Sequence, residues 1–179
     1  MEFWHNRILV LDFGSQYTQL IARRIREAQV YSQILPCTAP LATILAYRPQ
    51  GIVLSGGPSS VYEKKAPLVS KELFDQNIPI LGICYGMQLV THLSGGKVVK
   101  APHREYGRAD LLIDDRSDLF KGIGAGGSSV VWMSHGDRIE RMPKGFRSIA
   151  HTSNSPVAAM KAEDAQRRIY CLQFHPEVA

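Results

Sequence analysis

Short apolar runs that end in turns and lead into helical patterns constrain the fold of this chain more than any other feature. Three such runs stand in its first half, at Ile8–Phe13, Ile52–Leu54 and Ile78–Ile83. Apolar residues at near-helical intervals follow the first run over Gln16–Ala28 and the third over Tyr85–Leu93. Short buried strands that alternate with helices are typical of a parallel sheet covered on both faces. We therefore predict an α/β fold with a doubly wound, mostly parallel sheet and flanking helices.

The second half changes character, because short strand patterns separated by turn residues replace the helical spacing. The strand candidates are Lys97–Lys100, Ala109–Ile113, Ser129–Met133, Phe146–His151, Ala158–Met160 and Ile169–Phe174. We expect some of them to pair antiparallel and to extend the parallel core. No internal repeat or interdomain linker interrupts residues 1–179, so the sequence predicts a single domain.

Composition excludes several classes of protein. With 179 residues, of which 45% are apolar, the chain is long enough to bury a substantial core. Its apolar runs are too short to span a bilayer, and Met1–Arg7 lacks the basic and then apolar order of a secretory signal. Cys37, Cys84 and Cys171 include no C-x-x-C pair, which argues against a disulfide framework and a structural zinc site. We expect a cytoplasmic protein with reduced thiols, no membrane segment and no bound metal.

The net charge of +5 suggests an anionic partner, but the distribution of the charges disfavours nucleic acid. Arg23, Arg24 and Arg26 gather on one predicted helix, whereas the other arginines are scattered among acidic residues. A solvated surface is the commoner role of such residues. We therefore expect no nucleic-acid partner.

Cys84 lies on a glycine-flanked turn between the third apolar run and the helix that follows. Where a strand reverses sharply into a helix, the crowded backbone leaves no room for side chains, which accounts for Gly82 and Gly86. The sulfur would then face the first free amides of the helix, whose partial positive charge favours thiolate over thiol. These features predict a reactive cysteine. A buried structural cysteine in a glycine-rich turn fits this segment equally well when it is taken alone.

His175 is the candidate base, because it ends the predicted strand Ile169–Phe174 and opens the segment His175–Glu177. Residues two apart point the same way in an extended chain, and Pro176 favours extended geometry at His175. The imidazole and the Glu177 carboxylate are thus predicted neighbours, with the carboxylate orienting the ring and stabilising its positive charge. A surface strand that ends in a polar turn is the alternative interpretation of the tripeptide. When the tripeptide is considered together with the cysteine turn, a catalytic triad is the better interpretation.

Acyl transfer also needs two hydrogen-bond donors for the oxyanion. Tyr85 follows the cysteine and opens the helix, so its backbone N–H is one candidate. Gly57, in the turn after Ile52–Leu54, is the other, because a residue without a side chain lets the backbone approach a substrate closely. An ordinary Gly-Gly-Pro turn is the simpler explanation of that segment by itself.

Three other patterns are set aside. Asp12–Gly14 spells the kinase metal triplet, but the upstream glycine-rich loop and lysine of kinases are missing. Gly122–Gly127 fits G-x-G-x-x-G, yet a strand pattern follows where a dinucleotide site demands a helix. His135 is a rival base, but Ser134–Asp137 has the composition of a tight polar turn. We assign that segment to substrate contact or to structure.

Taken together, these motifs resemble the class I glutamine amidotransferase family over nearly the whole chain, and more closely its GMP synthetase branch. The matching segments are, in order, Leu11–Tyr17, Leu54–Pro58, Gly82–Gln88, His103–Gly107, Trp132–Asp137 and Gln173–Val178. The resemblance implies a flavodoxin-like fold. It also implies an enzyme that hydrolyses the side-chain amide of glutamine to glutamate and ammonia through a thioester at Cys84.

The resemblance further implies which residues contact the glutamine. Its α-amino and carboxylate groups would be held by Gln88 and by a turn that consists of Ser134, His135, Gly136 and Asp137. Because the Asp137 carboxylate is anionic, we expect it to contact the ammonium group. The family needs no cofactor or metal in this domain.

A partner is implied as well. In this branch the ammonia passes to an ATP-pyrophosphatase (synthetase) domain or subunit, which uses ATP and Mg²⁺ to adenylate and aminate XMP to GMP. That domain is absent from this sequence. Family members also continue past His-Pro-Glu-Val into a closing helix, whereas the sequence stops at Ala179. We therefore expect an amidotransferase domain, 1–179, that lacks its C-terminal helix.

Three alternatives stay open on the residues alone. Another class I amidotransferase would share the same triad. A cysteine-type α/β-hydrolase shares the nucleophile turn, but it places the acid before the histidine in the chain, whereas Glu177 follows His175. A regulatory module on the same fold is the third, because a fold alone does not prove activity.

Overall fold

The computed structural model describes residues 7–124 and 126–178. Met1–Asn6, which make up most of the segment considered as a secretory signal, lie outside the described residues. The same holds for Ala125, within the glycine-rich pattern set aside above, and for Ala179.

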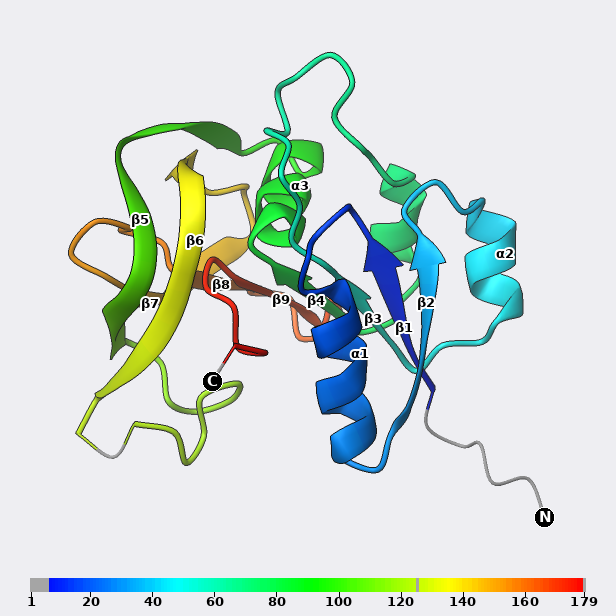
Figure 1. Cartoon of the computed structure of the whole chain (residues 1–179), viewed down its shortest axis with the longest axis horizontal. Helices are drawn as coiled ribbons and strands as arrows, with labels where there is room; N and C mark the ends of the chain where they lie inside the picture. The colour runs from blue at the N-terminus through cyan, green and yellow to red at the C-terminus, as the bar shows by residue number, and fades with distance from the viewer. Residues whose placement is uncertain (1–6, 125, 179) are drawn as a thin grey trace.

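One sheet runs through the molecule (Figure 1). Within the described residues it has nine strands: β1 (Arg7–Asp12), β2 (Tyr31–Pro36), β3 (Gly51–Leu54), β4 (Ile80–Ile83), β5 (Lys97–Ile113), β6 (Ser128–Arg141), β7 (Phe146–His151), β8 (Ala159–Ala162) and β9 (Ile169–Leu172). Their spatial order is β2-β1-β3-β4-β9-β8-β7-β5-β6. The helices are α1 (Thr18–Glu27), α2 (Leu41–Ala46), α3 (Tyr85–Leu93) and the short 3-10 helix η1 (Lys71–Asp75).

The strands β2, β1, β3, β4 and β9 are parallel and form the predicted core. Side chains alternate along β1, so that Val10 belongs to a buried cluster with Ile21 of α1 on one face. Leu9 belongs to the cluster on the other face, together with Met87 of α3 and Ile44 of α2. Burying a large apolar side chain stabilises a fold by roughly 1.5–3 kcal/mol. The doubly wound prediction is confirmed, because helices cover both faces.

Beyond β9, the strands β8, β7, β5 and β6 continue the sheet with antiparallel pairing. The predicted antiparallel extension is therefore confirmed. The prediction of separate strands at Lys97–Lys100 and Ala109–Ile113 is wrong, because both belong to the single strand β5. A register shift between Lys100 and Glu105 lets β5 pass a proline without losing its pairing with β6. Because the residues at this shift are polar, the hydrophobic pattern of the sequence does not show that β5 is one continuous strand.

The edge strand β6 returns to the carboxyl ends of the parallel strands. His175, beyond β9, donates its backbone N–H to the Trp132 carbonyl oxygen at 2.9 Å. Cys84, beyond β4, places its sulfur 3.6 Å from the Ser134 carbonyl oxygen. In Figure 1 the red segment after β9 runs between β6 and α1. The ends of β4 and β9 therefore face β6.

The segment Ser134–Asp137 is not the predicted turn, because it lies in the middle of β6. His135 pairs with Glu105 across the ladder to β5. Gly136 does not adopt the left-handed conformation that a hairpin turn often requires. Pairing with a strand that is distant in the sequence thus outweighs the local turn preference of these residues.

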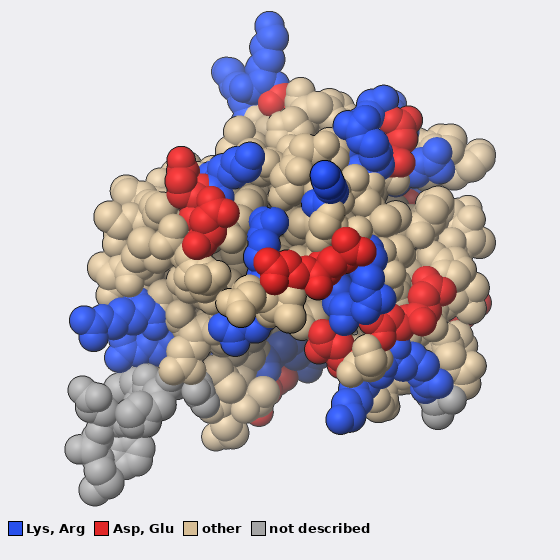
Figure 2. Space-filling view, turned by 180° about the vertical axis from the view of Figure 1, so that it is seen from behind, with Lys and Arg blue, Asp and Glu red and all other residues tan. Residues whose placement is uncertain are grey.

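Charged side chains of both signs are interspersed over the face in Figure 2, as expected of a solvated surface. On α1, Arg23 and Arg24 each lie 3.0 Å from a Glu27 carboxylate oxygen. Across residues 7–124 and 126–178, no helix is long and apolar enough to cross a membrane.

Candidate active site

A pocket of about 730 Å³ opens at the carboxyl ends of the parallel strands, where ligands bind in open α/β sheets. It is lined by the loops after β1 and β3, by the start of α3, by β6 and by the segment after β9. The predicted site residues among its lining are Gly57, Cys84, Gln88, Ser134, His135, Gly136, Asp137 and His175. Lys100, Arg104 and Tyr106 of β5 also line the pocket, so the structure brings together segments from six places in the sequence.

Cys84 occupies the junction of β4 and α3 with φ 51° and ψ −103°. A residue with a side chain rarely takes a positive φ, so the turn holds the thiol in a fixed and strained orientation. A methyl group on Gly82 would lie 2.8 Å from the Gly86 backbone, and one on Gly86 would collide with the Leu54 carbonyl. The predicted lack of room is confirmed. The Cys84 N–H also donates to the Leu172 carbonyl at 2.7 Å, which ties the turn to β9.

His175 lies beyond β9, which ends at Leu172 rather than at the predicted Phe174. Its Nδ1 is 2.7 Å from Glu177 Oε1, and both side chains are buried. The predicted contact is present, but the extended geometry predicted for it is wrong. The Val178 N–H donates to the His175 carbonyl at 3.2 Å and closes a turn. This turn brings the carboxylate to the ring.

The charge of His175 is set by its two neighbours. Burial opposes that charge, but hydrogen bonds to Cys84 and Glu177, together with their negative charges, outweigh burial and raise the pKa of His175 to about 9. The ring therefore keeps its proton at neutral pH. Because Nδ1 contacts Glu177, Nε2 is the nitrogen available to the sulfur.

The two other cysteines lie away from the pocket. Burial raises the pKa of the Cys37 and Cys171 thiols, and neither lines the pocket. All three cysteines are free of disulfides. Within the described residues, no group of three or more His, Cys, Asp and Glu side chains is arranged to hold a metal ion.

The loop after β3 passes close to the reacting side chains. A carbon added to Gly56 would lie 3.0 Å from His175 Cε1 and 3.7 Å from Cys84 Cβ. A carbon added to Gly57 would lie 2.6 Å from the Phe13 carbonyl oxygen. Only glycine allows this approach at position 57, and a side chain at position 56 would crowd the His175 ring.

The backbone N–H groups of the two predicted oxyanion donors lack acceptors. In the part of the chain that the structure describes, Gly57 and Tyr85 donate no backbone hydrogen bond. The next amide, that of Gly86, is satisfied because it donates to the Ser55 carbonyl at 3.1 Å. Free donors beside a nucleophile are what a developing oxyanion needs.

The other predicted substrate residues form one hydrogen-bonded group. Gln88 Nε2 donates to the Asp137 carbonyl oxygen at 3.4 Å. His135 Nδ1 lies 2.8 Å from the same oxygen, and its Nε2 lies 3.1 Å from Glu105 Oε2. Both ring nitrogens of His135 are thus occupied. The ring is therefore not placed to act as the base for Cys84.

Sequence analysis did not single out Ser60 and Tyr62. Ser60 Oγ donates to Asp137 Oδ2 at 2.5 Å, and the Tyr62 hydroxyl donates to Oδ1 at 2.8 Å. These contacts join positions at least 75 apart in the sequence. No local pattern relates such positions, so only the structure reveals the pairing.

Two more buried side chains near the site were missed. Gln173 Nε2 lies 3.8 Å from Cys84 Sγ. Glu105 accepts hydrogen bonds from the Thr152 hydroxyl at 3.0 Å and the Ser155 hydroxyl at 2.9 Å. Both Gln173 and Glu105 stand in segments that match the family, which is the signal that could have found them.

The comparisons with known proteins identify the family. The sequence model of the class I glutamine amidotransferase family matches residues 9–179. The glutamine-hydrolysing GMP synthase of Wolinella succinogenes is 54% identical over 175 residues, which cover 96% of this chain and 33% of that protein. That of Nitratiruptor sp. is 56% identical over 176 residues, again 96% of this chain and 33% of that protein. The chain spans about a third of the length of these relatives.

Solved structures give the same result for the fold. A Thermoplasma acidophilum protein described as a GMP synthase subunit superposes with a TM-score of 0.85 and 34% identity, over 97% of this chain and 85% of that one. A glutamine amidotransferase of Thermotoga maritima superposes with a TM-score of 0.76 over 98% of this chain and 77% of that one. At 22% identity, this second likeness supports the fold alone.

Proposed function

The chain belongs to the class I glutamine amidotransferase family, and from that premise we propose that it hydrolyses the side-chain amide of glutamine to glutamate and ammonia at Cys84. One observation carries the proposal. The strained Cys84, His175 and Gly57 line one pocket, while Glu177 contacts His175 from behind the lining and Tyr85 directly follows Cys84. Each role that acyl transfer requires is filled by one of these groups.

In the first half of the reaction, the Cys84 thiolate attacks the amide carbon of glutamine. The carbonyl oxygen becomes an oxyanion and accepts hydrogen bonds from the Gly57 and Tyr85 N–H groups. His175 then donates its proton to the amide nitrogen, the C–N bond breaks, and ammonia leaves. A pKa of about 9 keeps the His175 imidazole protonated for this step. The product on the enzyme is a thioester.

In the second half, a water molecule attacks the thioester carbon while neutral His175 takes one of its protons. The second oxyanion uses the same two N–H groups. When it collapses, the C–S bond breaks, glutamate forms, and the thiolate and imidazolium are restored. Throughout, the 2.7 Å contact with Glu177 holds the ring in one orientation.

Recognition of the amino-acid end of glutamine falls to β6 and α3. The Asp137 carboxylate lines the pocket and carries the charge that pairs with an α-ammonium group. Gln88, Ser134, His135 and Gly136 line the same part of the pocket. We assign the α-carboxylate to these groups.

The ammonia, we propose, serves the amination of XMP to GMP. Support comes from the names of the curated relatives and of the Thermoplasma acidophilum neighbour. Since the chain spans about a third of those relatives, we assign ATP, Mg²⁺ and XMP to an ATP-pyrophosphatase domain or subunit that acts with it in the cytoplasm.

Covalent labelling tests the first proposal. A diazoketone amino acid that mimics glutamine should alkylate Cys84, and mass spectrometry should find the adduct there. Cys84→Ala should abolish both the adduct and ammonia release. Labelling of Cys37 or Cys171 in place of Cys84 would sink the assignment.

Coupling to a partner tests the second proposal. We expect GMP to form when glutamine, XMP, ATP and Mg²⁺ are supplied with the pyrophosphatase portion of a relative, and we expect Cys84→Ala to block it. Added ammonia should restore GMP formation in the variant. If glutamine is hydrolysed but no GMP forms, the amidotransferase proposal stands and the XMP proposal does not.

A further inference from the structure

The loop that carries Gly57 is held in place at both ends. At its start, the Ser55 hydroxyl accepts a hydrogen bond from the Phe13 N–H at 3.0 Å and donates one to the Gly56 carbonyl at 2.8 Å. Ser55 is completely buried. The first two residues of the loop are thus fixed against the end of β1.

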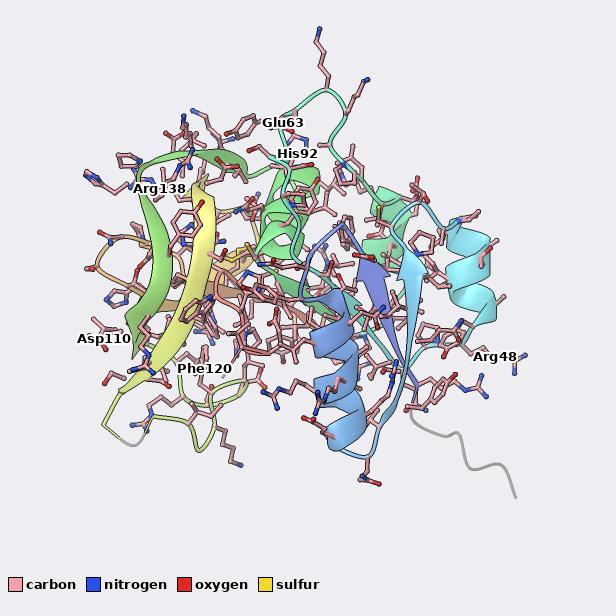
Figure 3. The ribbon with its side chains drawn as sticks, viewed as in Figure 1. Arg48, Glu63, His92, Asp110, Phe120 and Arg138 are labelled. Carbon is pink, nitrogen blue, oxygen red and sulfur yellow. The ribbon has the colours of Figure 1, made fainter. Side chains whose placement is uncertain are left out.

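At the far end, a turn attaches the loop to β6. The Glu63 N–H donates to the Ser60 carbonyl at 3.0 Å, which closes a four-residue turn over 60–63. From this turn the Ser60 and Tyr62 hydroxyls reach the two oxygens of the Asp137 carboxylate, at 2.5 and 2.8 Å. Figure 3 labels Glu63 on this loop, near the top of the molecule as drawn.

Asp137 is 8% exposed, and a buried carboxylate without partners is costly. Hydrogen bonds from the Ser60 and Tyr62 hydroxyls offset part of that cost. A carboxylate has about four acceptor positions, so the two hydroxyls leave room for an ammonium group. On its main chain, Asp137 also accepts from Gln88 and lies within reach of His135 Nδ1. The residue is therefore held from both sides.

We propose that Ser60 and Tyr62 are positioning residues that fix the Asp137 carboxylate for the α-ammonium of glutamine and couple its occupancy to the Gly57 loop. This inference rests on the proposed function. The Gly57 N–H and the hydroxyls that contact the Asp137 carboxylate sit on opposite ends of one short, pinned segment, since Ser60 follows Gly57 by three positions. When an ammonium group binds the Asp137 carboxylate, Ser60 and Tyr62 therefore transmit this binding to the loop that carries Gly57.

The test compares two electrophiles on the same chain. The glutamine-mimicking diazoketone carries an α-ammonium group, whereas iodoacetamide does not. In the double variant Ser60→Ala with Tyr62→Phe, labelling of Cys84 by the diazoketone should slow about tenfold or more, since hydrogen bonds to a charged group are lost. Labelling by iodoacetamide should stay within about twofold, because it uses neither Asp137 nor the amino-acid end of the pocket.

Tyr170→Phe is the matched control. It removes another tyrosine hydroxyl that donates to an aspartate, Asp118, at 2.7 Å, but Tyr170 does not line the pocket. Both labelling rates should be unchanged in it. Asp137→Asn is measured in parallel and should slow the diazoketone alone.

The outcomes separate the inference from the proposed function. If Asp137→Asn slows the diazoketone but the Ser60/Tyr62 double variant does not, the inference is overturned and the function stands. If Asp137→Asn has no effect, the proposed ammonium contact is wrong, and the inference falls with it. If both electrophiles slow equally in the double variant, the two hydroxyls only support the fold, which also overturns the inference.

Discussion

The parallel and the antiparallel halves of the sheet contribute different things to the site. The parallel half carries the groups that we propose to react, because Cys84 follows β4, His175 follows β9 and Gly57 lies in the loop after β3. The antiparallel half carries the proposed substrate contacts, Ser134–Asp137 of β6. In this proposal the reacting groups depend on local strand-to-loop junctions, and the substrate contacts depend on pairing between distant strands. Substitutions in the first group should change turnover, and substitutions in β6 should change affinity.

His175→Gln should have the largest effect, because it removes the proton carrier from the parallel half. General acid–base catalysis contributes about 10²–10⁴-fold, so we expect the turnover of glutamine to fall about a thousandfold. A steady-state ammonia assay measures this. Turnover within tenfold of the parent would mean that the parallel half does not supply the base.

Gly86→Ala should have the second-largest effect, because it distorts the turn that holds Cys84. The added methyl group collides with the Leu54 carbonyl, which is backbone and has little freedom to move. We expect a loss of about 3 kcal/mol in the free energy of unfolding. Gly126→Ala is the control, since a carbon there meets nothing within 4 Å. Equal urea midpoints for the two variants would contradict the prediction.

Asp137→Asn should act mainly on affinity. Losing one charged hydrogen bond to the substrate costs about 1.5–3 kcal/mol, so KM for glutamine should rise about ten- to a hundredfold. Turnover should fall less than KM rises. Asp110→Asn, on an exposed position of β5 labelled in Figure 3, should leave both constants unchanged. If turnover falls while KM stays unchanged, the proposed division of roles between the two halves of the sheet is wrong.

The pH profile should report the pKa of His175. Because that pKa is raised to about 9, the protonated ring and the stability that its pairing contributes persist below the free value of about 6.5 and are lost as pH rises through about 9. Diazoketone labelling should therefore decline above pH 9. In Glu177→Gln the decline should start about one pH unit lower, because an acceptor charge is missing. An unmoved decline would show that Glu177 does not stabilise the imidazolium.

Arg23→Ala should have the smallest effect. Its ion pair with Glu27 on α1 is largely exposed, and such pairs contribute about 0.2–1 kcal/mol. Thermal unfolding should shift by little, and ammonia release should not change. A loss of activity would show that the outer face of α1 belongs to the site.

The parallel half was the more predictable from sequence. Where a unit is contained in one short stretch, such as Ile78–Ile83 with the helix from Tyr85, local periodicity reveals it. The strand β2 and the helix α2 were missed, because β2 is a mostly half-exposed edge strand and α2 is short, with one buried residue. Cys84, His175 and Glu177 were singled out because a glycine-flanked turn and a His-Pro-Glu segment are recognisable local patterns. The geometry behind the last pair was wrong, since sequence did not show that β9 ends before Phe174.

The antiparallel half was less predictable because its pairings are long-range. The polar stretch of β5 and the segment Ser134–Asp137 look like turns in isolation, and only their mutual pairing makes them strands. The hydroxyls of Ser60 and Tyr62 were missed for the same reason. Their partner lies 77 and 75 positions away.

The strand β9 is synthesised after β4 and β8, yet it lies between them in the sheet. The Cys84 N–H donates to the Leu172 carbonyl of β9, and His175 follows the same strand, so the turn of the proposed nucleophile and the proposed base both depend on the insertion of β9. Because pairing between strands that are distant in the sequence is a slow step of folding, we expect the complete site to form only after β9 is seated.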